Sequence, residues 1–198
     1  MDRRFVYVAF KRCDPFRFKL LNRMYGSEQV EHCELVFPAK NQLFVAVQNN
    51  VSMVITEASR YVHYDQQYDD GSDMWILVPL DSLTNLQNDV LYDECVKLVG
   101  RPYNVGGMVT LVFSCFAFKY PQHALFCSEA LAIAFINSKI TTRADGAHRF
   151  IAMPVKCWPA DIFKYCMHIA ADRDELSSYA NTVDRYIAKS EHTKTILM

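Results

Sequence analysis

The run Phe126–Ile136, FCSEALAIAFI, constrains the fold of this chain more than any other stretch. After one cysteine and two polar residues it is apolar on every side of a helix, and alanine and leucine favour helix over strand. A helix without a polar face is a buried helix. The run therefore predicts a central core helix that begins near Cys127, with the rest of the chain packed around it.

Cys127 falls at the N-terminus of this predicted helix. The first backbone N–H groups of a helix have no partner within it, and the helix dipole favours negative charge there, so a thiolate would be stabilised. The same N–H groups would hold the oxyanion of an acyl-transfer intermediate. The position is therefore suited to a nucleophilic cysteine.

A thiol nucleophile needs a histidine that takes and returns the proton and a polar group that orients the imidazole. The segment Glu31–Phe37, EHCELVF, supplies His32 as the candidate base. In the structural alternatives, Cys127 is a small buried residue and His32 is a strand-end histidine bonded to backbone. Cys13 is a weaker rival nucleophile, because it precedes an Asp-Pro pair with no strong helix start to present it.

Gln48 is one candidate for the group that orients the imidazole. Two strands are predicted at His32–Phe37 and Leu43–Gln48, joined by a turn that contains Pro and Asn. If Phe37 pairs with Leu43, then His32 lies opposite Gln48, with both side chains on one face. A one-residue slip would spoil this pairing.

Two glutamates compete with Gln48 for the orienting role. Side-chain alternation puts Glu34 on the same strand face as His32 and Cys33 on the other. Glu57 lies near the end of a third predicted strand, Val51–Ala58. The residues alone leave Gln48, Glu57 and Glu34 open.

The remaining periodic segments predict an α+β fold, a small antiparallel sheet or partial barrel packed on the central helix. Further strands are expected at Phe5–Phe10 and Trp75–Leu80, and helices at Phe16–Met24, Asn88–Val99 and from Trp158 onward. We expect one domain over 1–170 and a polar helical tail over 171–198, where the composition becomes polar.

Composition limits the partners. A formal charge of -1 offers no bulk attraction for nucleic acid, so no nucleic-acid partner is expected. The seven cysteines form no C-x-x-C pair, and no signal sequence opens the chain, so reduced thiols in a cytoplasmic compartment are expected, without a metal site or cofactor. The apolar run Met108–Phe118 is too short to span a bilayer, although peripheral membrane contact stays open.

Five features in one order carry a resemblance to a known family. They are a first strand and helix, the HCELVF segment, a strand ending ITEA at Ala58, the loop Gly100–Tyr103 (GRPY) and the FCSEAL run at Cys127. Over roughly residues 5–170 the chain resembles the circularly permuted papain-like hydrolases of the NlpC superfamily. The similar branch is the YiiX/YaeF-like one, which includes viral members and is related to lecithin:retinol acyltransferase.

The resemblance implies a permuted papain-like fold with Cys127 as nucleophile and His32 as general base. Relatives place a polar residue on a strand after the histidine, which Glu57 matches, although the insert between His32 and Glu57 is longer than the compact pattern. Tyr103 and Ser128 are the candidate substrate contacts, and packing against the central helix is an equally open interpretation of Tyr103. A viral member would act in host cytoplasm or in the virion.

We therefore expect a thiol hydrolase or acyltransferase that cleaves an amide, isopeptide or ester bond of a peptide, protein or lipid acyl substrate through an acyl-enzyme. Two alternatives stay open. One is a catalytically idle descendant that binds a ligand in the old cleft, and the other is a virion or host-interaction protein in which the cysteine is structural. The oligomeric state and the bond cleaved are not determined by the sequence.

Overall fold

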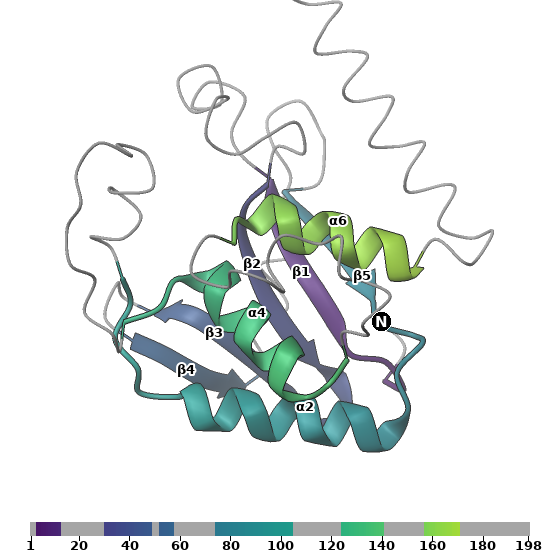
Figure 1. The fold of residues 1–198 in the computed structure, drawn as a ribbon. Coiled ribbons are helices and arrows are strands. Elements are labelled where there is room, and N and C mark those ends of the chain that lie inside the picture. The colour runs from purple at the N-terminus through teal and green to yellow at the C-terminus, as the bar shows by residue number, and fades with distance from the viewer. Residues whose placement is uncertain are drawn as a thin grey trace, which may run out of the picture.

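Five strands and three α-helices form two layers in the part of the chain that the computed structural model describes, namely residues 3–12, 30–48, 52–57, 74–104, 124–140 and 157–170 (Figure 1). The strands are β1 (Tyr7–Arg12), β2 (Val30–Phe37), β3 (Gln42–Gln48), β4 (Ser52–Glu57) and β5 (Trp75–Pro79). The helices are α2 (Asn85–Leu98), α4 (Cys127–Asn137) and α6 (Pro159–Ala170), with a 3-10 turn, η1, at Pro38–Lys40.

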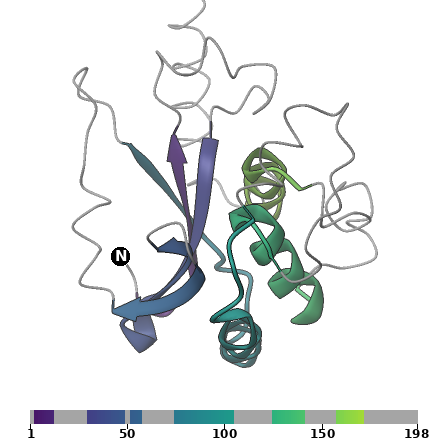
Figure 2. The same cartoon turned by 90° about the vertical axis from the view of Figure 1, so that its left-hand side faces the viewer.

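The strands form one antiparallel sheet in the order β4-β3-β2-β1-β5. Figure 2 shows the three helices together on one face of this sheet. Helices α4 and α6 both pack on β2, the central strand, and α2 packs on α4. The predicted α+β class with a small antiparallel sheet is confirmed.

The predicted central helix is α4, and it begins at Cys127 as expected. Leu131 and Phe135 have no exposed surface and pack into the core between the sheet and the other helices. Phe135 also meets the ring of Tyr165 from α6, with ring centroids 6.1 Å apart. A helix that is apolar all round is stable here because it has the sheet on one side and helices on others.

Strand β2 shows the alternation that its sequence predicts. Cys33, Leu35 and Phe37 belong to the core between sheet and helices. Val36 belongs to a second cluster on the opposite face, which also contains Tyr7, Ala9 and Leu43. His32 and Glu34 follow the parity of Val36.

The predicted register between β2 and β3 is wrong by one residue. Phe37 pairs with Gln42, and Leu43 pairs with Val36. Asn41 adopts a left-handed conformation, φ 53°, and its N–H donates to the carbonyl of Pro38 over 3.2 Å. Asparagine tolerates this conformation, so the turn closes one residue earlier than expected and the pairing of His32 with Gln48 is lost.

Helix α2 begins earlier than the predicted Asn88 because Thr84 caps it. The Thr84 hydroxyl accepts from the N–H of Gln87 over 3.2 Å, and the Gln87 side chain accepts from the N–H of Thr84 over 2.9 Å. This capping box satisfies two N–H groups that the helix itself leaves unpaired.

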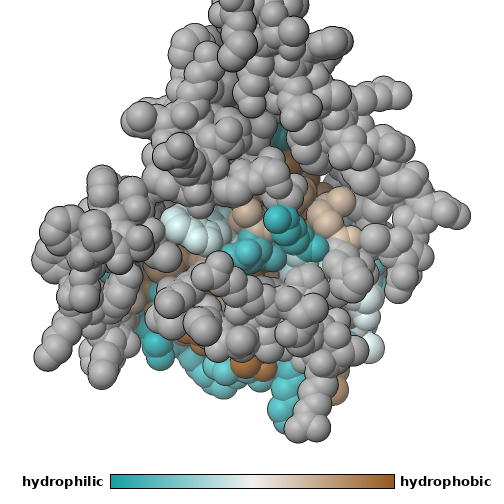
Figure 3. Space-filling view, turned by 45° about the horizontal axis from the view of Figure 1, so that its top comes forward, coloured by the Kyte–Doolittle hydropathy of each residue, from teal (hydrophilic) through white to brown (hydrophobic). Residues whose placement is uncertain are grey.

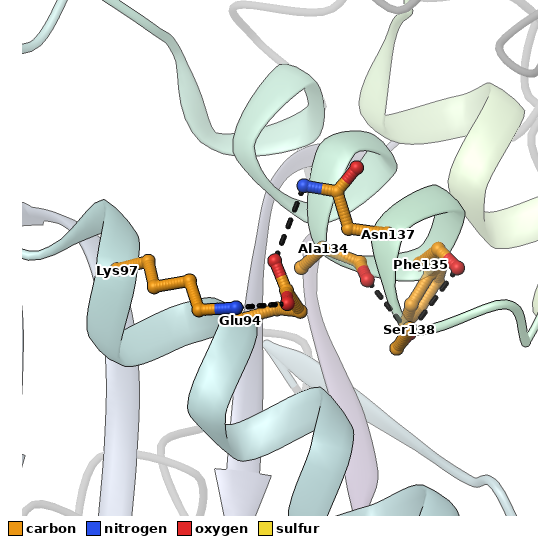
Figure 4. A network of polar contacts seen from close by, with 6 residues as sticks. All are labelled: Glu94, Lys97, Ala134, Phe135, Asn137 and Ser138. Carbon is orange, nitrogen blue, oxygen red and sulfur yellow. Dashed lines mark hydrogen bonds and ion pairs between the residues drawn. The ribbon is translucent and has the colours of Figure 1, made fainter.

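Polar contacts join the outer side of α2 to the end of α4 (Figure 4). Glu94 accepts from Lys97 over 2.5 Å and from Asn137 over 3.2 Å. Ser138, just past α4, donates to the carbonyl of Ala134 over 2.7 Å.

Figure 3 shows hydrophobic side chains set among hydrophilic ones along its lower edge, where α2 lies. Among the residues that the structure describes, the exposed large hydrophobic side chains are on or next to this helix: Leu86, Val90, Val96 and Val99.

Several predicted elements lie outside the described residues. These are the helix at Phe16–Met24 with the rival Cys13, the apolar run Met108–Phe118 and the tail from residue 171. Within the described residues, every helix is too short or too polar to cross a bilayer.

Candidate functional site

Cys127 is the first residue of α4, and only 4% of its surface is exposed. The preceding residue, Phe126, has the extended backbone of an N-cap, with φ −104° and ψ 173°, and its side chain cannot cap the helix. The first N–H groups of α4 have no intrahelical acceptor and point toward the N-terminus of the helix, where Cys127 lies. This geometry is the one that the sequence predicts for an activated cysteine.

His32 lies on β2 and joins two partners. Its Nε2 is 3.0 Å from Oε1 of Glu34, and its imidazole is close enough to the Cys127 thiol for each group to shift the pKa of the other. The indole of Trp75 meets the imidazole edge to face, with centroids 6.2 Å apart. The structure therefore brings Cys127, His32 and Glu34 together in one chain of contacts.

The His32 side chain is partly accessible, with 20% of its surface exposed. On the N-terminal side of Leu35 no pairing between β2 and β3 is described, because β3 pairs with β2 only from Gln42 to Phe44. His32 therefore lies on a part of β2 that is paired with β1, opposite Lys11. The side chains of His32 and Cys33 alternate in direction along β2. Cys127 is close to both, which fits a position where β2 has no described pairing with β3.

The electrostatics of Cys127 and His32 are those of a thiolate–imidazolium pair. Burial lowers the pKa of His32, but the charge and hydrogen bond of Cys127 and the hydrogen bond to Glu34 outweigh it and raise that pKa to about 10. A hydrogen bond with Cys33 and the charge of His32 hold the pKa of Cys127 well below its usual range, against the effect of burial. Both shifts favour transfer of the proton from the thiol to the imidazole.

Cys33 is a neighbour of the site that the sequence analysis missed. Its side chain is fully buried on the helix-facing side of β2, close enough to that of Cys127 for each thiol to shift the pKa of the other. Burial and the Cys127 thiolate raise its own pKa well above the usual range, so Cys33 stays protonated and can donate its S–H. The alternation of β2 predicts that Cys33 faces the central helix, and that was the available signal.

The loop Arg101–Asn104 runs beside the segment that leads to Cys127. Tyr103 forms a bridge with Leu125, and the N–H of Asn104 donates to the carbonyl of Leu125 over 3.0 Å. On its other side, Pro102 bridges to Ser52 of β4. The GRPY loop thus connects the sheet to the segment that leads to Cys127. Tyr103 is half-buried, and its partner Leu125 lies two residues before Cys127.

Ser128 and Glu129 complete the first turn of α4, and both are buried. The hydroxyl of Ser128 donates to the carbonyl of Cys157 over 2.6 Å, which ties α4 to the start of α6. The Glu129 carboxyl accepts from the backbone N–H of Phe126. Ser128 is therefore occupied in a structural hydrogen bond, whereas Glu129 lies close to the backbone of Phe126, the residue before Cys127.

The other two candidates for orienting His32 differ in position from Glu34. The backbone of Glu57 pairs with Gln42, which pairs with Phe37. Phe37 is five residues from His32, or roughly 16 Å along a strand, so the register does not bring Glu57 beside the histidine. The side chains of Glu57 and Gln48 lie outside the described residues.

Among the described residues, no group of three or more His, Cys, Asp or Glu side chains is arranged to hold a metal ion.

No protein-family model, no curated protein and no solved structure matches this chain.

Proposed function

We propose that this protein is a cysteine hydrolase or acyltransferase of permuted papain-like fold, with Cys127 as nucleophile, His32 as general acid and base, and Glu34 as the residue that orients His32. The observation that carries the proposal is the contact of Cys127, at the N-terminus of a buried helix, with a histidine that is bonded to a carboxylate. A thiolate at a helix N-terminus beside an imidazolium is the arrangement that nucleophilic thiol catalysis requires.

In the first half-reaction the Cys127 thiolate attacks the substrate carbonyl, and N–H groups at the start of α4 stabilise the oxyanion. The imidazolium of His32 gives its proton to the leaving amine or alcohol, and a thioester remains on Cys127. In the second half, His32 takes a proton from water or an acceptor alcohol, which attacks the thioester. Collapse of that intermediate releases the acyl product and restores the thiolate–imidazolium pair.

The substrate class consistent with this chemistry is an amide, isopeptide or ester of a peptide, protein or lipid acyl group. The five described cysteines are free thiols, which supports action in a reducing compartment such as cytoplasm.

Glu34 supports the histidine through one hydrogen bond of 3.0 Å, with its side chain 13% exposed.

The test is the pH dependence of iodoacetamide alkylation at Cys127, followed by peptide mass spectrometry in wild type and in His32→Ala. With its pKa lowered, Cys127 should alkylate on the order of 10- to 100-fold faster than an ordinary thiol at slightly acid pH. Loss of His32 should move the alkylation curve toward the free-thiol pKa of about 8.5. Since the pKa of His32 is about 10, the pair should persist through neutral pH.

Hydrolysis of an activated aryl ester provides the second readout. Cys127→Ala and His32→Ala should abolish it while circular dichroism shows a retained fold, and Cys95→Ala, a buried cysteine on α2, is the matched control that should retain it. Full ester hydrolysis in either site variant, or a Cys127 that alkylates no faster than Cys95, would refute the proposal. The catalytically idle binding protein would then be the better interpretation.

A further inference from the structure

Four buried cysteines cluster where β2, α4 and the start of α6 meet. They are Cys33, Cys127, Cys157 and Cys166, all part of one hydrophobic core cluster. Cys33 faces the helix layer from β2, on which α4 packs, and Cys127 is the first residue of α4. The Cys127 thiol acts on the pKa of Cys33 more strongly than Cys157 does, and its effect on Cys157 comes through charge. Cys166 lies farther along α6 and interacts with Cys33 only through charge. The first neighbour of the Cys127 sulfur among the described thiols is therefore Cys33.

The four thiols differ in their ionisation. The pKa of Cys127 is lowered by its hydrogen bond with Cys33 and by His32. Burial raises the pKa values of Cys33, Cys157 and Cys166, so these thiols keep their protons. Because peroxides react with thiolates rather than thiols, oxidation in this cluster starts at Cys127.

Nothing in acyl transfer requires a second thiol at the nucleophile. A cysteine that touches an oxidisable thiolate is, however, the arrangement of a resolving cysteine, which traps a sulfenic acid as a disulfide before further oxidation. Access favours a small oxidant, since Cys127 is only 4% exposed and borders the partly exposed His32.

We propose that Cys33 and Cys127 form a peroxide-oxidisable pair, in which Cys33 resolves the sulfenic acid of Cys127 as a reversible Cys33–Cys127 disulfide. In the first step the Cys127 thiolate attacks hydrogen peroxide, which breaks the O–O bond, forms Cys127–SOH and releases hydroxide. In the second step the Cys33 sulfur displaces the hydroxyl of the sulfenic acid, and the Cys33 proton leaves with it as water. Two electrons pass from the sulfurs to the peroxide, and a dithiol reductant restores both thiols.

Disulfide formation shortens the distance between the two sulfurs to about 2 Å. Cys127 is the first residue of α4, where the helix has a free end, whereas Cys33 is held in β2 by pairing with Phe10 of β1. The adjustment therefore falls on the first turn of α4. Because Cys127 is consumed, the disulfide would also block the nucleophile until it is reduced.

The experiment treats the full-length protein with a small excess of hydrogen peroxide, blocks remaining thiols with iodoacetamide and maps the peptides by mass spectrometry. Wild type should give a Cys33–Cys127 linked peptide, and dithiothreitol should restore nearly all alkylation of Cys127. In Cys33→Ser, Cys127 should pass to sulfinic and sulfonic acids, with recovery by dithiothreitol reduced several-fold. Cys33→Ala tests the same loss of the thiol without a hydroxyl, and circular dichroism verifies the fold of both variants.

Cys157→Ala is the matched control, because Cys157 is the competing neighbour of Cys127, and it should leave the Cys33–Cys127 disulfide in place. A Cys127–Cys157 peptide, unchanged recovery in Cys33→Ser or no peroxide product at Cys127 would each overturn the proposal. The readout is a mass and not turnover, so it distinguishes failure of this pair from failure of the proposed hydrolase activity.

Discussion

Glu129→Gln tests whether the carboxyl two residues after Cys127 weakens the folded state as it ionises. Glu129 is 3% exposed, and its Oε2 has no hydrogen-bond partner among the described residues. Burial disfavours the charged form and raises the pKa of Glu129 to about 7 from 4.5, although the N–H of Phe126 partly offsets this. Glutamine keeps an acceptor for that N–H and carries no charge at any pH.

The sign follows from the raised pKa. Below pH 4.5 the carboxyl is neutral in both the folded and unfolded states, so it has no pH-dependent effect. Between 4.5 and about 7 the unfolded state ionises and the folded state does not, so the free energy of unfolding falls as pH rises. A difference of about 2.5 pKa units at about 1.36 kcal/mol each corresponds to a loss on the order of 3 kcal/mol, complete above the folded pKa.

The assay is urea denaturation of wild type and Glu129→Gln at several pH values from acid to mildly alkaline. The difference between the two proteins cancels groups that both share, including the His32–Cys127 pair, and a pH-independent offset absorbs any change in packing. The wild type should lose about 3 kcal/mol relative to the variant as pH rises. A pH-independent difference would show that Glu129 titrates normally or is neutral throughout, and the argument from burial would fail.

Two further predictions concern stability at constant pH. Thr84→Ala removes the capping box of α2 and should lower the free energy of unfolding by about 1 kcal/mol, measured by urea denaturation, whereas an unchanged midpoint would mean that the cap contributes nothing. Leu131→Ala, in the fully buried centre of α4, should cost about 2–5 kcal/mol by the same measurement. Leu86→Ala, with Leu86 74% exposed on α2, is the matched control and should stay within about 0.5 kcal/mol, so equal effects would contradict the assignment of α4 to the core.

The predicted helix at Cys127 and the alternation of β2 needed no tertiary information. The FCSEALAIAFI run has no polar face, and that alone predicts burial on all sides. Its polar start places Cys127 at the N-terminus, the positive end of the helix dipole. The parity of His32 and Glu34 follows from the period of two in a strand. These are local properties, since they depend on neighbours a few residues away.

The partner of His32 could not be chosen in the same way. The expected pairing with Gln48 depended on the length of one turn, and Asn41 in the left-handed conformation shifts the register by a residue. Side chains alternate between the two faces of a strand, so a register shift of one residue changes which side chains of the two strands share a face. Only the folded chain decides between Glu34, which lies 3.0 Å from His32, and the two candidates on later strands.

By itself the sequence determined which segment is buried, where Cys127 lies on it and which strand carries His32, because periodicity and helix-end chemistry are local. The tertiary structure decided that Glu34 meets His32, that Cys33 meets Cys127 and that Glu129 is buried with one oxygen lacking a partner in the described chain. Cys33 and Cys127 lie far apart in the chain, whereas the contact of Glu34 with His32 and the unpartnered oxygen of Glu129 depend on what packs around each side chain. Such contacts and burial arise only when β2, α4 and α6 pack together, since no local sequence pattern encodes them.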